Sequence, residues 1–406
     1  TASKEVVIIG GGMAGFCTAA ALAKRGWQCI IIEREAAPAR AGSGNQNAIL
    51  MPRLSVDHDI QSQLTLQGFL FSRQLFQQLD QNQNSILWHG CGAIQIARDA
   101  TQAERMQQIV TQENIPEQLI QVISQEQACA LSNCQLNAGG WYIPLAGWIV
   151  PSQLCQALQA QYPEQIKFIG GENITRLAAH DQGWQVRSQD RTIAVAEHVI
   201  LANANAITQF QQSQWCQLHA KRGQLTHIPC ARSHVHPQTI VCADIYLTPA
   251  VNQHYILGAS FISDDDSTTL RASEHQENLT RLKKIMPEAA TSVDDVSGRA
   301  AVRAVGPDRL PVVGPIARQK QFQHDFQAAA GGNTRTHYPL PEYYQGLYVA
   351  SGFGSRGLAW IPLCAEALAS ILNDEPSPLS RSVLQALHPN RILMKQLVSQ
   401  HKKLRQ

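Results

Sequence analysis

Three glycines near the start of the chain have the spacing of a dinucleotide-binding turn. Gly10, Gly12 and Gly15 follow an apolar run in the pattern G-x-G-x-x-G. The first glycine permits a tight turn, the second lets a pyrophosphate approach the backbone, and the third lets the next helix pack closely. Glu33 ends a second apolar run about 20 residues further on, where its carboxylate can accept hydrogen bonds from ribose hydroxyls. These residues predict a site for FAD or NAD without separating the two.

A second glycine-rich segment lies near the other end of the chain, between a predicted strand and a predicted long helix. Small residues at a helix start let backbone N–H groups reach a ligand, and the positive helix end stabilises negative charge. A second cofactor-binding segment so far along the chain favours FAD over NAD, because FAD is long and needs contacts from distant segments. We expect five residues of this segment to contact the flavin: Gly354, Ser355, Arg356, Gly357 and Leu358.

The composition is that of a folded globular protein with no general affinity for polyanions. The chain has 406 residues, 44% of them hydrophobic, and a net charge of +2. The ten cysteines include no C-x-x-C pair, which favours free buried thiols in a reducing cytosol. The histidines lack metal-ligand spacing, so no metal site is predicted. No apolar run reaches the roughly 18 residues of a membrane span, and a cytoplasmic location is expected.

The order of the predicted elements indicates two interleaved domains. The predicted fold class is α/β, with a Rossmann-like FAD-binding domain interleaved with an antiparallel-sheet α+β substrate domain. We predict that the FAD-binding domain comprises 1–85, 145–215 and 298–375, that the substrate domain comprises 86–144 and 216–297, and that 376–406 form a basic C-terminal tail.

Five segments resemble the FAD-dependent oxidases of D-amino-acid and glycine oxidase type. They are the N-terminal glycine motif, 42–45, 199–203, the R-x-x-x-P-D-x-x-P-x-x-G run of 303–314, and 351–358. The resemblance covers nearly the whole chain and implies a glycine oxidase-like fold with non-covalently bound FAD. Ala48 departs from the family pattern, in which glycine is expected at this position.

The resemblance assigns further residues to the cofactor. Ser43, Gly44 and Asn45 are expected to cap a helix N-terminus and to offer backbone N–H groups to a phosphate or the flavin edge, with plain capping as the alternative. Arg34 is expected to cover the adenine, or else to be an exposed arginine after a strand. Asn203 follows a predicted strand and either contacts the cofactor or starts a turn.

Arg303 and Tyr246 are the candidate catalytic residues. Arg303 stands where the related oxidases hold the substrate carboxylate, and arginine suits planar bidentate capture of a carboxylate. A structural salt bridge is its alternative role. Arg299, four residues earlier on the same predicted strand, is a weaker second candidate. Tyr246 matches a strand from which related oxidases place a substrate-contacting tyrosine, and a core tyrosine is the alternative.

Three stretches resemble one branch of the family more closely, the flavin halves of bifunctional bacterial tRNA-modifying enzymes. They are 43–45, 354–366 and 387–391. The implied activity removes the carboxymethyl group, as glyoxylate, from 5-carboxymethylaminomethyl-2-thiouridine at the tRNA wobble position and leaves 5-aminomethyl-2-thiouridine. The alternatives are an oxidase of free glycine, sarcosine or D-amino acids, and a non-enzymatic flavin- or RNA-binding module.

That branch also implies partners. In it, an S-adenosylmethionine-dependent methyltransferase domain precedes the flavin half, and the start at Thr1 without methionine leads us to expect a processed chain or a domain cut from a longer protein. The tRNA is expected to meet local basic patches. One candidate patch is the C-terminal segment, in which an apolar stripe (Leu393, Met394, Leu397, Leu404) would hold a helix carrying Arg391, Lys395, Lys402, Lys403 and Arg405 on the body; a solvated tail is the alternative.

Overall fold

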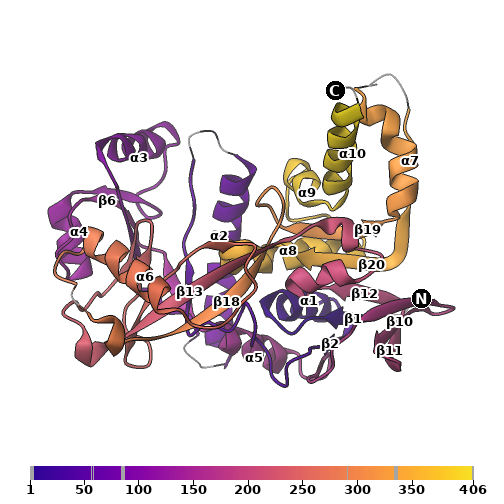
Figure 1. Cartoon of the computed structure of the whole chain (residues 1–406), viewed down its shortest axis with the longest axis horizontal. Helices are drawn as coiled ribbons and strands as arrows, with labels where there is room; N and C mark the ends of the chain where they lie inside the picture. Colours follow the sequence, from indigo (N-terminus) through magenta and orange to yellow (C-terminus); the bar gives the residue numbers. More distant parts are fainter. Residues whose placement is uncertain are drawn as a thin grey trace. The chain divides into compact units, whose positions relative to one another are not determined.

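The computed structural model of the chain divides into two compact units, each assembled from separate stretches of sequence (Figure 1). It describes residues 4–55, 57, 59–83, 87–289, 291–332 and 337–404. Unit 1 comprises Thr1–Ser43, Cys155–Ala220 and Arg303–Gln406, and unit 2 comprises Gly44–Leu154 and Lys221–Val302. The helix α5 (Pro151–Gln161) contains one of the boundaries between them.

Unit 1 is built on a mainly parallel sheet of buried apolar strands. Its order is β19-β20-β12-β1-β2-β8, with every pair parallel except β19 and β20. Parallel strands are covered on both faces, which explains continuous apolar runs such as Val6–Ile9. The strands are β1 (Glu5–Ile9), β2 (Gln28–Ile32), β8 (Ile166–Ile169), β12 (His198–Leu201), β19 (Val312–Ala317) and β20 (Tyr343–Ser351).

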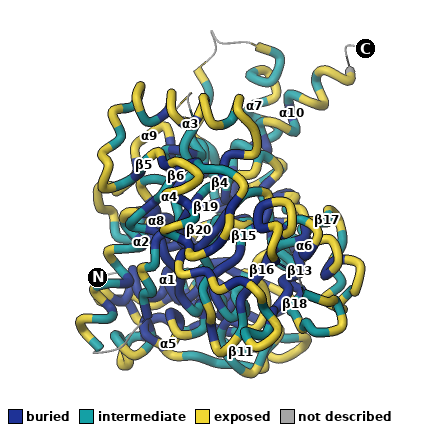
Figure 2. The backbone as a smooth tube through the Cα atoms, turned by 90° about the vertical axis from the view of Figure 1, so that its left-hand side faces the viewer, coloured by how far each residue is buried: buried dark blue, intermediate teal, exposed yellow. Residues whose placement is uncertain are grey.

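Helices cover this sheet and a small antiparallel sheet adjoins it. The helices α1 (Met13–Ala23) and α8 (Gly357–Leu372) pack against each other. Figure 2 shows the centre of β19 and β20 in the dark blue of buried residues. The other elements of unit 1 are β9 (Arg176–His180), β10 (Gly183–Ser188), β11 (Arg191–Ala196), η1 (Ala204–Gln209), η2 (Gln214–Cys216), η5 (Gly354–Arg356), α7 (Gln319–Ala330), α9 (Arg381–Leu387) and α10 (Asn390–Leu404).

The predicted C-terminal tail is folded into unit 1. Helix α10 packs against α7, and Figure 1 shows α9, α10 and α7 together. Leu393 and Leu397 are buried in the core of unit 1, and Met394 packs against it, so the predicted apolar stripe is confirmed for these residues. The side chain of Leu404 and the whole of Arg405 lie outside the described residues.

Unit 2 is built on a nine-stranded, largely antiparallel sheet. Its order is β17-β13-β16-β15-β14-β4-β6-β5, and β18 pairs with β13 off this path. The strands are β4 (Ala93–Ile96), β5 (Gln121–Ile123), β6 (Gly140–Ile143), β13 (His219–Pro229), β14 (Ile240–Cys242), β15 (Tyr246–Leu247), β16 (His254–Gly258), β17 (Ile262–Ser263) and β18 (Ser297–Val305).

The division into units differs from the predicted boundaries at several places. Residues 44–85, 145–154 and 298–302, expected in the FAD-binding domain, lie in unit 2, and residues 216–220, expected in the substrate domain, lie in unit 1. Long-range pairing explains the first two differences, because β3 (Ala48–Leu50) and β7 (Gly147–Ile149) form a two-stranded antiparallel sheet. The long helix α2 (Ile60–Gln83) also belongs to unit 2, as do η3 (Cys230–Arg232), η4 (Val293–Asp295), α3 (Ala100–Gln112), α4 (Gln125–Ser132) and α6 (Ala272–Ile285).

The ten cysteines are all free thiols, as predicted, and most are buried. Burial raises the pKa of Cys17, Cys29 and Cys242 to about 12, so these groups are neutral core thiols at physiological pH. In the described part of the chain, none of the helices has the length and apolar character that crossing a membrane requires.

Candidate functional site

The turn between β1 and α1 requires glycine at two positions. Gly10 has a φ of +118°, and a Cβ atom there would lie 2.6 Å from the carbonyl oxygen of Ala202. A Cβ atom on Gly15 would overlap the carbonyl oxygen of Gly10. Gly12 is the N-cap of α1, where backbone N–H groups without a helical partner meet the positive end of the helix dipole. The turn therefore has the shape and polarity of a pyrophosphate cradle.

Glu33 lies next to this turn. One carboxylate oxygen accepts from the backbone N–H of Gly11 at 2.5 Å, and the other accepts from Glu35 N at 3.1 Å. A carboxylate has about four lone-pair sites, so capacity for ribose hydroxyls remains. Arg34 is exposed, with its guanidinium 3.4 Å from Glu35. The contacts of Glu33 and Arg34 with the adenosine part of the cofactor stay predictions.

Ser43 caps α1 from a distant part of the sequence. Its hydroxyl accepts from the backbone N–H of Met13 at 3.2 Å, although residues 40–47 are not helical themselves. Asn45 does not cap a helix, because its side-chain oxygen accepts from Arg299 at 2.9 Å within unit 2. Gly44 also falls in unit 2. The capping prediction thus holds for Ser43, and the expected cofactor contacts of all three residues stay predictions.

Asn203 follows β12 directly behind the glycine turn. A Cβ atom on Gly10 would lie 2.8 Å from the backbone nitrogen of Asn203. Asn203 is the N-cap of η1, and its buried Oδ1 atom has no hydrogen-bond partner among the described residues. A buried polar atom without a partner costs about 1–3 kcal/mol, and a bound dinucleotide with hydroxyl donors would satisfy it.

The C-terminal glycine segment folds as predicted, as a strand, a turn and a helix. Gly352 and Gly354 have φ values of +77° and +57° between β20 and α8. Leu358 is buried. Arg356 places its guanidinium 5.7 Å from the ring centre of Trp360. The side chains of Arg356 and Leu358 thus pack within unit 1, and the backbone N–H groups of Gly354, Ser355 and Gly357 stay the predicted flavin contacts.

Arg299 and Arg303 lie on β18, where residues four apart project to the same side of the strand. Arg299 donates to Asn45, which makes it a bridging residue within unit 2. Arg303, half-buried, is the first residue of the last stretch of unit 1. The strand geometry predicted for both is confirmed, and the substrate role of Arg303 stays a prediction.

Tyr246 is the first residue of β15 and lies directly opposite Gly258 of β16. A Cβ atom on Gly258 would lie 3.4 Å from the Tyr246 hydroxyl oxygen. The hydroxyl therefore extends over a position that lacks a side chain. This half-buried tyrosine lies on a sheet face, and the core alternative describes it less well.

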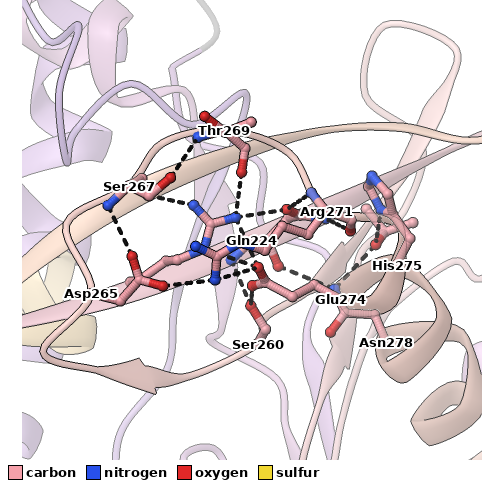
Figure 3. Close-up of polar contacts among 11 residues, drawn as sticks. Gln224, Ser260, Asp265, Ser267, Thr269, Arg271, Glu274, His275 and Asn278 are labelled. Carbon is pink, nitrogen blue, oxygen red and sulfur yellow. Dashed lines mark hydrogen bonds and ion pairs between the residues drawn. The ribbon is translucent and has the colours of Figure 1, made fainter.

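The opposite face of the same sheet carries a buried ionic network for which no sequence motif gave a signal (Figure 3). Arg222 is fully buried and donates to Glu274 Oε1 and Gln224 Oε1, each at 2.9 Å, and to Thr269 O at 2.7 Å. Glu274 also accepts from the hydroxyl of Ser260. The network satisfies the guanidinium of Arg222 and holds the segment before α6, so it has a structural role.

Potential metal ligands are dispersed through the described part of the chain. Among residues 4–55, 57, 59–83, 87–289, 291–332 and 337–404, no three His, Cys, Asp or Glu side chains gather so as to hold a metal ion. The two glycine turns stay the predicted cofactor contacts, and Arg303 and Tyr246 stay the predicted substrate residues.

Two curated relatives match nearly the whole chain. The chain is 37% identical to the tRNA 5-methylaminomethyl-2-thiouridine biosynthesis bifunctional protein MnmC of Pseudomonas syringae pv. syringae, over 97% of this chain and 59% of the relative. It is 39% identical to the protein of the same name from Pseudomonas syringae pv. tomato, over 97% of this chain and 60% of the relative. The chain thus spans about 60% of the length of these relatives.

Solved structures agree on the fold. The glycine oxidase of Geobacillus kaustophilus matches with a TM-score of 0.75 at 19% identity, over 95% of this chain and 98% of that one. The L-proline dehydrogenase of P. horikoshii matches with a TM-score of 0.73 at 18% identity, over 96% and 97%. The family model for FAD dependent oxidoreductases matches residues 5–371. The cofactor is FAD, as predicted, and the chain belongs to the FAD dependent oxidoreductase family.

Proposed function

We propose that this protein oxidises the carboxymethylamino group of 5-carboxymethylaminomethyl-2-thiouridine at the tRNA wobble position. The products are glyoxylate and 5-aminomethyl-2-thiouridine. The observation that carries this proposal is the match over 97% of the chain to relatives named for 5-methylaminomethyl-2-thiouridine biosynthesis in tRNA. The family-model match over residues 5–371 includes the strand that bears Arg303, the residue best suited to the substrate carboxylate.

Arg303 would bind the carboxylate of the N-carboxymethyl group through two parallel N–H···O bonds. This contact fixes the methylene carbon between the carboxylate and the amine. FAD, when bound, would supply the acceptor for the hydride of that methylene. The amine nitrogen would then share a C=N bond with this carbon and lose its proton. Water then adds to the C=N carbon, the C–N bond breaks, and glyoxylate leaves the aminomethyl nucleoside behind.

The chain's other contribution is positioning and electrostatics. The backbone N–H groups of Gly354, Ser355 and Gly357 at the start of α8 would stabilise negative charge on the reduced cofactor. Gly10, Gly12, Gly15, Glu33 and Asn203 would hold its pyrophosphate and adenosine part. We infer non-covalent attachment, because no His or Cys stands in a recognised attachment context.

The proposed partners follow from the same relatives. The substrate would be tRNA, a methyltransferase domain using S-adenosylmethionine would complete the longer protein, and the location would be the cytoplasm. Support comes from the names of the relatives and from the fact that the chain spans 59–60% of their length.

The test is mass spectrometry of nucleosides from tRNA before and after incubation with the purified holoprotein. We expect loss of the carboxymethylaminomethyl nucleoside and equimolar gain of the aminomethyl nucleoside and glyoxylate. Free glycine and sarcosine serve as competing substrates. Turnover of these amino acids with unchanged tRNA would replace the proposal by that of a free amino-acid oxidase.

A further inference from the structure

Among the described residues of unit 2, five buried polar side-chain atoms lack a hydrogen-bond partner, and three of them belong to His227 and to the adjacent residues Gln46 and Asn47. These three are Nε2 of His227, Oδ1 of Asn47 and Oε1 of Gln46. Leaving such an atom unsatisfied is unfavourable, because no hydrogen bond replaces those that it made to water. Native structures contain few of them, so a group of three calls for a ligand or an ordered water.

His227 projects away from α6. Its neighbour Thr226 faces α6, because it shares a hydrogen bond of 2.8 Å with His275 of that helix (Figure 3). Because side chains alternate along a strand, His227 lies on the opposite face. On β18, a Cβ atom on Gly298 would lie 2.5 Å from the ring of His275, so Gly298 faces α6. The next residue, Arg299, therefore projects to the same face as His227.

Asn47 lies over the same face. Its side-chain N–H donates to the hydroxyl of Thr248 at 2.9 Å, and Thr248 pairs with Ile256 through a 3.1 Å backbone bond. Ile256 in turn lies directly opposite His227. His227, Ile256 and Thr248 thus form one row across β13, β16 and the end of β15, about 10 Å long at two strand spacings.

The neighbouring row holds Tyr246. It runs from Leu225 through Gly258 to Tyr246, two residues along each strand from the first row. The segment from Asn45 to Asn47 crosses the face, since Asn45 binds Arg299 at one end and Asn47 binds Thr248 at the other. The unpartnered atoms of His227 and Asn47 therefore lie at the face that carries Tyr246 and Arg299, and Gln46 belongs to the segment that crosses this face.

The chemistry of the three atoms defines what they can bind. Burial, followed by the nearby charges of His254, His275 and Arg299, lowers the pKa of His227 to about 4. The imidazole is therefore neutral at physiological pH, with one nitrogen as donor and one as acceptor. The amide oxygens of Gln46 and Asn47 only accept. A ligand that matches this set carries N–H donors beside a carbonyl acceptor, and an anion would meet repulsion from the amide oxygens.

We propose that this face of unit 2 binds the pyrimidine ring of the substrate nucleotide. The ring N–H donates to an amide oxygen of Gln46 or Asn47, and the ring carbonyl accepts from Nε2 of His227. This inference rests on the proposed function, which supplies a thiouridine as substrate. The flavin ring carries a similar N–H and carbonyl edge, so the experiment must separate the two sources.

The experiment compares His227→Ala, His227→Gln and Gln46→Leu holoenzymes with His236→Ala. His236 is exposed, belongs to unit 2 and bonds Tyr255 at 2.7 Å, which makes it the matched control. Two quantities are measured. The first is the perturbation of the flavin absorption during titration with the carboxymethylaminomethyl-2-thiouridine nucleoside. The second is the dissociation constant of FAD.

We expect His227→Ala and Gln46→Leu to weaken nucleoside binding about tenfold, the equivalent of about 1.4 kcal/mol. His227→Gln, which keeps a donor, should recover part of the loss, and FAD affinity should stay at the wild-type value. Weakened FAD binding would assign the face to the cofactor, and unchanged nucleoside binding would overturn the inference as well. If wild-type protein binds the nucleoside in this His227-dependent way but fails to oxidise modified tRNA, the proposed function fails while the binding face stands.

Discussion

Arg391 donates two hydrogen bonds to the carboxylate of Asp308, Nε to Oδ2 at 2.9 Å and Nη2 to Oδ1 at 3.0 Å. The same guanidinium donates to the carbonyl oxygens of Leu310 at 3.0 Å and Pro311 at 2.9 Å. One arginine of the C-terminal helix therefore holds the whole loop that follows the strand bearing Arg303. The sequence places Arg391 in a basic patch for tRNA, and the structure corrects this: the residue is an internal clamp of unit 1.

The ion pair between Arg391 and Asp308 predicts how the free energy of unfolding depends on pH. Burial by itself would raise the pKa of Asp308, but Arg391 and Lys395 outweigh it and hold the pKa far below the usual value. The carboxylate therefore stabilises the fold above its unfolded pKa of about 3.9, and this contribution is lost as pH falls further. Asp308→Asn should lower the free energy of unfolding by about 3 kcal/mol at pH 7. Urea unfolding at pH 7 and below pH 4 should show the gap to wild type narrowing in acid. A gap of constant size would mean that the ionised pair contributes nothing.

The substrate role of Arg303 is tested by a pair of lysine substitutions. Arg303→Lys keeps the charge but loses the planar fork, so kcat/KM should fall about 100-fold while FAD stays bound. Arg299→Lys, on the same side of β18 but engaged with Asn45, should have a much smaller effect. Steady-state kinetics and the flavin spectrum measure both quantities. Equal losses in the two variants would make Arg303 no more than another structural arginine of this strand.

The glycine turn is tested by adding one methyl group. Gly15→Ala places a Cβ atom against the carbonyl oxygen of Gly10, and the purified protein should lose most of its flavin absorbance. Gly26 is the control, because a Cβ atom there meets nothing within 4 Å although its φ is +80°. Gly26→Ala should cost about 1 kcal/mol of stability and keep its flavin. Full flavin content in Gly15→Ala would refute the assigned cradle.

The predicted tRNA contacts of the C-terminal segment are limited to the exposed lysines at the end of α10. Arg391 and Lys395 both bind Asp308, whereas Lys402 and Lys403 are exposed. Each phosphate contact contributes about 0.7–0.9 to the slope of log K against log salt. The double variant Lys402→Ala/Lys403→Ala should therefore weaken tRNA binding and reduce the slope by about 1.5. Lys283→Ala/Lys284→Ala, exposed residues of α6, is the matched control. An unaltered slope in the α10 variant would move the tRNA contact to another surface.

The features that sequence predicts well are local. The turn of Gly10, Gly12 and Gly15 and the turn at Gly354 each join a strand to the next helix, so spacing and residue type define them. The ion pair between Asp308 and Arg391 joins residues 83 apart, and both belong to motifs visible in the sequence. Their pairing could not be predicted, because no local pattern encodes which distant segment completes a buried charge.

The same limit explains the boundary and capping differences. Ser43 does cap a helix, but that helix begins 30 residues earlier in the chain, at Met13. Asn47 meets Thr248 across 201 residues of sequence. Contacts between residues so far apart in the sequence depend on how the sheets assemble. A single sequence contains no periodic pattern that predicts them. The sequence predicts the glycine turns, Arg303 and Tyr246, whereas the neighbouring side chains of His227 and Asn47 are evident only in the structure.

Modified tRNA, rather than a free amino acid, should reduce the flavin of this protein. The most direct measurement mixes the oxidised holoprotein with purified tRNA bearing 5-carboxymethylaminomethyl-2-thiouridine under anaerobic conditions and follows the yellow flavin absorption. We predict stoichiometric bleaching by the modified tRNA and little by glycine or sarcosine at equal concentration. Bleaching by glycine or sarcosine, with no response to the modified tRNA, would contradict the proposed function.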